Sequence, residues 1–398
     1  MSLVPFSEAP LLPRPLRWGM VGGGKGSQIG YSHRDAAKRD GLFSLQAGAF
    51  DIDPARGQAF GQSLGLAAER CYADYRALLA GEARRSDGIE VLSITTPNNS
   101  HYEICHAALT AGLHVVCEKP LALEEKQALE LEALAKSKDR VLAVMYGYTG
   151  YEMVQQAKSM VESGTLGAVR IVQMQFAHGW HATEVEANDP GAKWRVTPAV
   201  SGPTYVLGDI GTHCFQMGAF ISGLEVESLC CMRSSFIPSR APLEDNAHVM
   251  LRYKSKQAGV TSAVGTLWAS AVNVGSPHSF KVRVVGEKGS IEWWDEQPNQ
   301  LQVGLIGQPA MVYERGHGHL NASARFERVG GGHPAGYFDS WANLYRRFAW
   351  AMAGQKNPQD AVDSTELYYP QARDGVLGVR FVERCAESAD TGSQWVAF

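Results

Sequence analysis

The sequence lacks the features that would place it in a membrane or in an oxidising compartment. No apolar run approaches the ~18 residues that a membrane-spanning helix needs, and no signal-peptide pattern opens the chain. The seven cysteines are scattered and odd in number, without a C-x-x-C pair, which argues against a disulfide framework or a zinc knuckle. We therefore expect a soluble, cytoplasmic protein with reduced thiols.

The sequence also lacks an excess of charge of one sign. Lys and Arg number 37 against 41 Asp and Glu, which gives a formal net charge of −4 over 398 residues. This balance produces no global basic field, so nucleic acid is not an expected partner. Glycine, by contrast, is plentiful: 42 residues fit a fold with many tight strand-to-helix turns.

What the chain does have is a regular alternation of predicted strands and helices from residue 16 to 148. Strict alternation of this kind predicts a doubly wound parallel sheet with helices on both faces, the Rossmann arrangement. Residues 1–15 contain four prolines and are expected to form an extended arm. The strands are predicted at 17–22, 43–50, 88–95, 114–117 and 141–146.

After residue 148 the rhythm changes, and strand patterns dominate. Phe280, Val282 and Val284 alternate with Lys281 and Arg283, as expected of a sheet with one covered face. Residues 149–398 are therefore predicted to form a second, α+β domain on an antiparallel or mixed sheet. Its strands are predicted at 169–176, 247–253, 259–270, 279–286 and 290–294, with helices near 151–163, 341–352 and 374–388.

A glycine-rich loop, Gly22-Gly23-Gly24-Lys25-Gly26-Ser27-Gln28-Ile29-Gly30, follows the first predicted strand. Glycine at such a turn lets the backbone approach a dinucleotide pyrophosphate. Matched rigidly to G-x-G-x-x-G, the third position falls on Ser27, whereas a three-residue insertion places it at Gly30. Asp51 ends the second strand, where its carboxylate suits ribose hydroxyls and repels a 2′-phosphate, so NAD is favoured over NADP. Asp53 is expected to cap the next helix, because Pro54 suits a first helical position.

Two further segments carry groups suited to proton transfer. Lys119, in Glu118-Lys119-Pro120, lies at the carboxyl end of a predicted strand, where α/β sheets bind ligands and a lysine can hydrogen-bond a substrate hydroxyl. Asp209 and His213 share one face if a helix begins there, and a carboxylate beside a histidine suits acid–base work. Asp209 as a helix cap and the pair as metal ligands are alternatives. No third ligand has a recognisable spacing, so no metal is predicted.

Together these motifs resemble those of the Gfo/Idh/MocA oxidoreductases, which include glucose–fructose oxidoreductase and inositol dehydrogenase. The resemblance spans about residues 16–385, in the family's order. The motifs that carry it are Gly22-x-Gly24, Ile29-Gly30-x-x-His33, Asp51-x-Asp53-Pro54, Thr96-Pro97-Asn98-x-x-His101, Glu118-Lys119-Pro120 and Asp209-x-Gly211-x-His213.

The resemblance implies a fold and a set of site residues. It implies a Rossmann domain followed by a domain whose large, open, predominantly antiparallel sheet commonly mediates dimers or tetramers. Lys119, Asp209 and His213 would be catalytic, and the bond before Pro120 is often cis in the family. The cofactor would be held by Gly22, Gly24, Lys25, Ile29, Gly30, Asp51, Thr96, Pro97, Asn98, His101, Glu118 and Lys119.

Substrate contacts follow from three segments similar to those of a sugar- or cyclitol-oxidising branch: His178-Gly179-Trp180, Lys193-Trp194-Arg195 and Gly332-His333-Pro334-Ala335-Gly336-Tyr337. Trp180, Arg195, His333 and Tyr337 would join Lys119, Asp209 and His213 around a polyol, although Trp180 and Tyr337 could equally be packing residues. The chain departs from the family in its longer pyrophosphate loop and at Gly147-Tyr148, where many members have Asn-Arg.

The expected activity is that of an NAD(P)-dependent dehydrogenase acting on a secondary hydroxyl of a sugar or cyclitol. One alternative is NAD-dependent glycoside cleavage through transient oxidation, which uses the same residues. The other is a non-catalytic nucleotide-sensing regulator, which would be expected to lose the lysine and the histidine that are present here. The sequence leaves open the exact substrate and which of Lys119 and His213 is the formal base.

Overall fold

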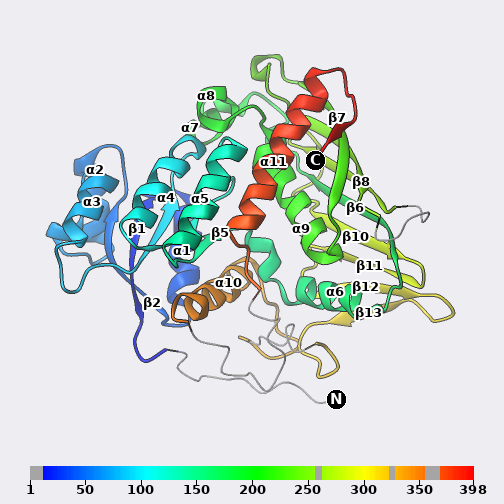
Figure 1. Cartoon of the computed structure of the whole chain (residues 1–398), viewed down its shortest axis with the longest axis horizontal. Helices are drawn as coiled ribbons and strands as arrows, with labels where there is room; N and C mark the ends of the chain where they lie inside the picture. Colours follow the sequence, from blue (N-terminus) through cyan, green and yellow to red (C-terminus); the bar gives the residue numbers. More distant parts are fainter. Residues whose placement is uncertain (1–11, 256–261, 322–327, 355–367) are drawn as a thin grey trace. The chain divides into compact units, whose positions relative to one another are not determined.

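The computed structural model describes residues 12–255, 262–321, 328–354 and 368–398 (Figure 1). The described chain divides into two compact units. We call the first the Rossmann unit; it holds the described residues up to Gly150 and those from Tyr337 to Val376. The second, the sheet unit, holds the described residues from Tyr151 to Gly336 and from Leu377 to Phe398.

The Rossmann unit is built on a five-stranded, all-parallel sheet of order β2-β1-β3-β4-β5. The order reverses between β1 and β3, which is where doubly wound sheets bind ligands. The predicted parallel sheet is confirmed, and one helix, α3, was not predicted. The elements are β1 (Leu16–Gly22), α1 (Gln28–Lys38), β2 (Phe43–Ala49), α2 (Pro54–Ser63), η1 (Ala68–Arg70), α3 (Tyr75–Glu82), β3 (Val91–Thr95), η2 (Asn98–Ser100), α4 (His101–Thr110), β4 (His114–Cys117), α5 (Glu125–Ser137), β5 (Leu142–Val144) and η3 (Gly147–Gly150).

The start of α2 shows why the chain turns where it does. The Asp53 side chain accepts hydrogen bonds from the backbone N–H groups of Ala55 and Arg56, and Pro54 takes the first helical position. A carboxylate cap satisfies N–H groups that have no partner within the helix, and a proline there loses nothing by lacking its own. The predicted capping role of Asp53 is confirmed.

The sheet unit contains a nine-stranded sheet of order β13-β12-β11-β10-β6-β9-β8-β7-β14. Every neighbouring pair is antiparallel except β6 and β9, so the predicted predominantly antiparallel sheet is confirmed. Its strands are β6 (Val169–Ala177), β7 (Val226–Ser234), β8 (Asn246–Tyr253), β9 (Val264–Ser270), β10 (Lys281–Gly286), β11 (Gly289–Trp294), β12 (Gln300–Leu305), β13 (Met311–Glu314) and β14 (Val396–Ala397).

Helices of the sheet unit pack on one face of this sheet. A Cβ on Gly218 of α9 would lie 2.2 Å from Sδ of Met174, so α9 rests directly on β6. Residues 259–261 of the strand predicted at 259–270 lie outside the described residues. The helical segments are α6 (Glu152–Glu162), η4 (Val185–Ala187), α7 (Pro190–Lys193), η5 (Trp194–Val196), α8 (Pro198–Ser201), η6 (Leu207–Gly211), α9 (Thr212–Ser222), η7 (Pro238–Arg240) and, from Leu377 onward, α11 (Ala372–Asp390).

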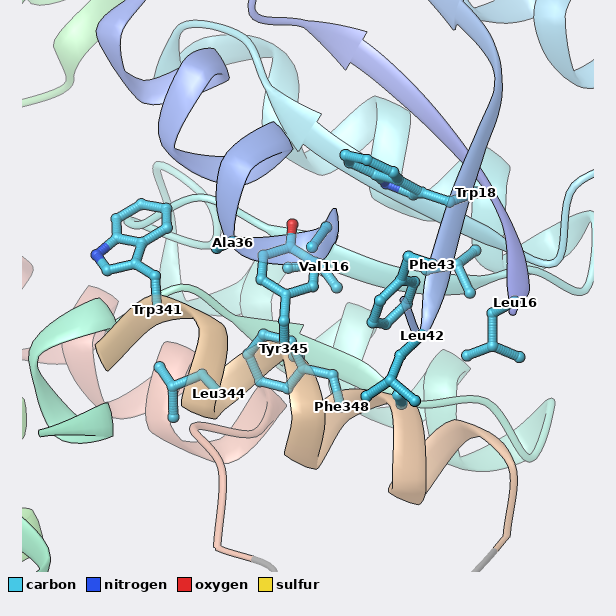
Figure 2. Close-up of a cluster of buried hydrophobic side chains, with 14 of the residues drawn as sticks. Leu16, Trp18, Ala36, Leu42, Phe43, Val116, Trp341, Leu344, Tyr345 and Phe348 are labelled. Carbon is cyan, nitrogen blue, oxygen red and sulfur yellow. The ribbon is translucent and has the colours of Figure 1, made fainter. Parts of the chain in front are cut away.

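Helix α10 (Tyr337–Met352) belongs to the Rossmann unit, although it follows the sheet unit in the chain. Figure 2 shows its buried face, with Trp341, Leu344, Tyr345 and Phe348 packed in a hydrophobic cluster with residues of the Rossmann sheet. The rings of Trp18 and Tyr345 are 6.3 Å apart and edge-on. The contiguous domain predicted over residues 149–398 therefore differs from the observed grouping, in which the chain returns to its first unit.

The close approach of η3 to α10 accounts for the glycines that end the Rossmann series. A Cβ on Gly147 would lie 2.1 Å from Nε1 of Trp341, and one on Gly150 would lie 1.9 Å from the backbone oxygen of Ser340. Real Cβ atoms do not approach that closely, so the packing of α10 excludes larger residues here. An asparagine at Gly147 would therefore clash with Trp341 in this chain. Among the described residues, no helix is both long and apolar enough to cross a membrane.

Candidate active site

The glycine-rich loop brings backbone against backbone at the carboxyl end of β1. Gly22 and Gly23 have φ values of +79° and +68°, a region that favours glycine. A Cβ on Gly30 would lie 2.3 Å from Cα of Gly23, so the first turn of α1 packs directly on the loop. Ser27 caps that turn by accepting the Gly30 N–H at 3.1 Å. Gly30 thus makes the close approach expected of the third glycine, despite the insertion.

Asp51 lies just past the end of β2 and is paired with Arg56 of α2. Nη2 of Arg56 donates to Oδ1 at 2.8 Å and Nε donates to Oδ2 at 3.2 Å, and these bonds lower the pKa of Asp51. The Arg56 side chain is 66% exposed, so the pair is worth little and leaves the carboxylate accessible. Arg56 was not predicted as a site residue, although an arginine five residues after the ribose-binding candidate is visible in the sequence.

Two loops that contain predicted cofactor residues are joined by His101. Its Nδ1 lies 2.7 Å from the Pro120 carbonyl oxygen and its Nε2 lies 2.8 Å from that of Thr96. The ring is completely buried, and burial lowers the pKa of His101. A direct contact between His101 and a cofactor stays a prediction; the observed contacts hold the Thr96 and Lys119 loops together.

The loop of Lys119 is held from behind by Glu118. The Glu118 carboxylate is 6% exposed; its Oε2 accepts the Lys119 N–H at 3.2 Å and its Oε1 lies 3.0 Å from Nε2 of His33. The Lys119–Pro120 bond is cis, as the family resemblance implies. Asn98 is buried and Thr96 half-buried on the neighbouring loop, while Lys25 and Pro97 are exposed.

A buried hydrogen-bond chain continues behind His33. Its Nδ1 lies 2.5 Å from the Tyr345 hydroxyl, which lies 3.0 Å from Oγ of Ser93, and Ser93 accepts the Trp18 indole N–H at 2.9 Å. A carboxylate only accepts, so a His33 ring with a single proton carries it on Nε2 and accepts the Tyr345 hydroxyl proton at Nδ1; the Tyr345 oxygen then accepts from Ser93. Burial raises the pKa of Tyr345, so this hydroxyl stays protonated. Sequence analysis placed His33 in a motif but gave no role to Tyr345.

In the sheet unit, Asp209 and His213 lie on one helical stretch formed by η6 and α9. Asp209 sits in the π-turn η6 and its backbone N–H bonds to the Tyr205 oxygen, so it is inside the helix rather than its cap. Single π-turns are frequent at functional sites because they reorient side chains. Nε of Arg195 donates to Oδ2 of Asp209 at 3.2 Å, which brings two predicted site residues together. No group of three metal-ligating side chains occurs among the described residues.

Aromatic rings surround the His213 side of this helix. Phe176 lies 6.4 Å from the His213 ring and 6.1 Å from that of His178, which stacks on Trp180 at 4.4 Å. The His278 ring lies 5.5 Å from Trp180, which is still 58% exposed, so part of this side chain is open to a ligand. Burial lowers the pKa of His178 to about 4, and this ring is therefore neutral near pH 7.

A second ring pair lies beside this one. The His181 and Tyr205 rings are stacked and hydrogen-bonded through Nδ1 and the hydroxyl, and burial lowers the pKa of His181. His178, His181 and Tyr205, which lie beside the predicted residues, were not themselves predicted as candidates from the sequence. Two histidines flanking Trp180 in one short segment were the available signal.

The remaining predicted substrate residues, His333 and Tyr337, make their observed contacts elsewhere than with Arg195, Asp209 and His213. His333 is exposed on a loop, and its backbone oxygen accepts a bond from Arg315. Tyr337 packs among aromatic rings of the Rossmann unit, 5.2 Å from Trp341 and 6.3 Å from Tyr148. The structure therefore places Lys119, Tyr337 and the cofactor candidates on the Rossmann unit, and Trp180, Arg195, Asp209, His213 and His333 on the sheet unit.

Comparison with known proteins adds an independent line of evidence. A family model described as an oxidoreductase NAD-binding Rossmann fold matches residues 16–146, and one described as an oxidoreductase C-terminal alpha/beta domain matches residues 158–398. The chain is 47% identical over 392 residues to the uncharacterized oxidoreductase YfiI of Bacillus subtilis (strain 168), covering 98% of both chains.

Solved structures give the same result. The chain is 49% identical to an inositol dehydrogenase homolog of Azotobacter vinelandii complexed with NAD+, with a TM-score of 0.93 and coverage of 99% of this chain and 100% of the other. A second structure from that organism, complexed with NADH and myo-inositol, matches with a TM-score of 0.91 at the same identity and coverage.

Proposed function

Because the chain belongs to the Gfo/Idh/MocA oxidoreductase family, we propose that it is an NAD-dependent dehydrogenase that oxidises a secondary hydroxyl of a sugar or cyclitol. The observation that carries the proposal is the helical stretch with Asp209 and His213 beside the stacked Trp180–His178 pair. An aromatic face suits the C–H surface of a polyol, and the acid–base groups suit its hydroxyls. The relative complexed with NADH and myo-inositol supports the same substrate class.

The glycine-rich loop fits a dinucleotide. Gly22 and Gly23 present bare backbone, and the Gly23–Gly30 approach leaves room for no side chain. Asp51 would hold the ribose hydroxyls, and the Thr96 and Lys119 loops would face the rest of the cofactor. When NAD is bound, it supplies the hydride acceptor, and the protein supplies position and charge. We propose NAD over NADP because a second negative charge beside Asp51 is unfavourable, although Arg56 offsets part of that repulsion.

The proton chemistry falls to three side chains. Oxidation of the alcohol breaks one C–H and one O–H bond; the hydride leaves from carbon, and the hydroxyl proton passes to His213. The Asp209 carboxylate stabilises the positive charge that develops on that ring. Lys119 donates a hydrogen bond to the same oxygen and stabilises its developing negative charge. The hydrogen bond from Nε of Arg195 to Oδ2 holds the Asp209 side chain in place.

The test is a cofactor-reduction assay against inositols, monosaccharides and anhydrosugars. We expect NADH formation with at least one neutral polyol, and a loss of at least about 100-fold in kcat for Lys119→Ala and His213→Ala. Lys126→Ala on α5 and His106→Ala on α4 are matched surface controls that should keep wild-type activity. Absence of NADH with every polyol, or full activity in both site variants, would refute the proposal.

We also propose that the sheet unit forms a dimer or tetramer through the face of its sheet opposite α9. Ile171, Met250 and Val264 are 38%, 49% and 47% exposed on adjacent strands of that face. Apolar side chains grouped in this way favour association. The mass of the protein in solution tests this.

A cytoplasmic location is the last part of the proposal. All seven cysteines are free, which suits a reducing compartment. Six of these thiols are buried, so the protein is purified without reductant and unfolded in denaturant before thiol titration. The titration should count seven thiols, and a lower count would contradict the proposal.

A further inference from the structure

A buried carboxylate lies at the start of the helical stretch that carries Asp209 and His213. Glu244, just before β8, is 1% exposed. Its Oε1 accepts hydrogen bonds from the backbone N–H groups of Tyr205 and Leu207, both at 3.0 Å. Its backbone oxygen accepts a hydrogen bond from the backbone N–H of Val206 at 3.4 Å. One residue therefore satisfies three N–H groups at the beginning of this helix.

These bonds matter because the first N–H groups of a helix have no acceptor within it. Helices are normally capped by a residue adjacent in sequence, but Glu244 lies 37 and 39 residues away from the N–H groups it accepts. The cap thus fastens the helix start to the strand that follows Glu244. Its negative charge also interacts favourably with the positive end of the helix dipole.

We infer that Glu244 is a positioning residue, which holds the helix of Asp209 and His213 in place for proton transfer; the inference rests on the proposed roles of those two residues. Asp209 lies within the first turns after the capped N–H groups, and His213 follows one turn later. A small displacement of the helix start would move both side chains, and misplacement by about 1 Å can cost 100-fold in rate.

The charge of Glu244 is itself sensitive to pH. Its Oε2 lies 3.8 Å from Nη1 of Arg233 on β7, and the Cys385 thiol of α11 also senses its charge. Burial outweighs the attraction of Arg233 and raises the pKa of Glu244 to about 7. Protonation makes the carboxyl a weaker acceptor and removes the dipole interaction, so the cap weakens as pH falls through about 7.

The neighbouring residue provides a matched control. Asp245 is also completely buried and also accepts two backbone N–H groups, those of Phe236 and Ile237, at 2.9 and 2.8 Å. These belong to the segment after β7 and not to the helix of Asp209. If Glu244 were merely structural, its replacement would affect catalysis no more than replacement of Asp245. If it is a positioning residue, its replacement will change catalysis.

The experiment compares wild type, Glu244→Gln and Asp245→Asn by amide hydrogen exchange and by steady-state kinetics over pH 5.5–8.5. We expect about tenfold faster exchange at residues 205–208 in E244Q and a kcat lowered about tenfold with little change in KM. We also expect the pH profile of wild-type kcat to have an inflection near pH 7 that E244Q lacks. D245N should keep the wild-type kcat and pH profile. Wild-type exchange at these amides should itself rise as pH falls below 7, after correction for intrinsic exchange.

The inference fails if exchange at residues 205–208 in wild type does not depend on pH near 7, a result that needs no variant to fold. It also fails if E244Q keeps the wild-type kcat and inflection, or if D245N changes them equally. Failure of the proposed function would appear differently, as full activity in Asp209→Asn and His213→Ala, and would leave the exchange result unchanged.

Discussion

At the scale of single residues, the carboxylates of this chain are distinguished by their partners. Asp51 is paired with an exposed arginine, Asp209 with Arg195, Glu118 with a buried histidine, and Glu244 with backbone N–H groups. Asp51, Asp209 and Glu118 follow from sequence because each belongs to a short motif. Glu244 does not, because the bonds that define it join segments nearly forty residues apart and leave no local pattern.

The Asp51–Arg56 pair predicts a measurable cofactor preference. Asp51→Ala removes the acceptor for the ribose hydroxyls and leaves the Arg56 guanidinium free to attract a 2′-phosphate. We expect the kcat/KM ratio of NAD to NADP to fall by about tenfold or more, since hydrogen bonds to charged groups are worth about 1.5–3 kcal/mol. Arg56→Ala should move the ratio the other way. An unchanged ratio in Asp51→Ala would show that Asp51 does not select the cofactor.

Glu244 also predicts a pH dependence of stability with a definite sign. Its pKa is about 7 in the folded chain against an ordinary value of 4.5, so between these values the folded protein holds a proton that the unfolded chain has lost. The free energy of unfolding should therefore fall as pH rises from 4.5 to 7, by on the order of 3 kcal/mol. Denaturant unfolding should show the free energy of unfolding of wild type falling relative to that of E244Q as pH rises across this window. A difference that does not change with pH would contradict the assignment.

Stability and catalysis then respond to Glu244 in opposite directions. Lowering the pH below 7 protonates the carboxyl, which relieves the cost of a buried charge but weakens the cap on the helix of Asp209. If Glu244 had only a structural role, its protonation would change activity and stability in the same direction.

At the scale of elements, sequence patterns identified the long and regular segments. The strand–helix alternation up to residue 148 and helix α10 were predicted because their periodicities are clear. Helix α3 and strands β7, β12, β13 and β14 were missed. Strands β12 and β13 are short and carry few β-branched residues, so tertiary pairing rather than local preference fixes them.

The contact between η3 and α10 predicts the effect of one methyl group. Gly150→Ala places a Cβ where the Ser340 oxygen already lies, 1.9 Å away, so η3 must move off α10. Such overpacking costs about 1–3 kcal/mol, which chemical denaturation should detect as a lower midpoint. Gly336→Ala, whose Cβ would meet nothing within 4 Å, is the matched control and should leave the midpoint within error. Equal midpoints for wild type and Gly150→Ala would mean that the two elements are not in contact.

At the scale of the whole molecule, chain order and spatial grouping differ. The sequence predicts one boundary between the two domains, near residue 148, whereas the described residues pass between the two units three times, after Gly150, Gly336 and Val376. Periodicity reports which face of α10 is apolar but not which unit supplies the partner surface. The boundary of a domain that the chain re-enters is therefore not readable from local patterns.

The open face of the nine-stranded sheet predicts association of whole molecules. Light scattering should give a mass of two or four times 43.2 kDa for wild type. Met250→Glu introduces a charge into the exposed apolar group and should shift the mass toward one chain. Val274→Asp, at a loop residue that is 80% exposed, is the control and should keep the wild-type mass. A monomeric wild type would rule out the proposed assembly.

The buried hydrogen-bond chain behind Glu118 has a consequence for how the protein is made. The Tyr345 hydroxyl is synthesised 252 residues after Ser93 and 312 residues after His33. At about 5–20 residues per second, Ser93 and the apolar side chains around Trp18 are synthesised roughly 10–65 s before Tyr345 of α10, which covers them in the folded chain. Ribosome-bound chains that end before residue 337 should be cleaved readily near Trp18, and chains in which α10 has emerged should resist. The hydrogen-bond chain that supports the Lys119 loop would then be completed among the last events of folding, although the loop itself is synthesised early.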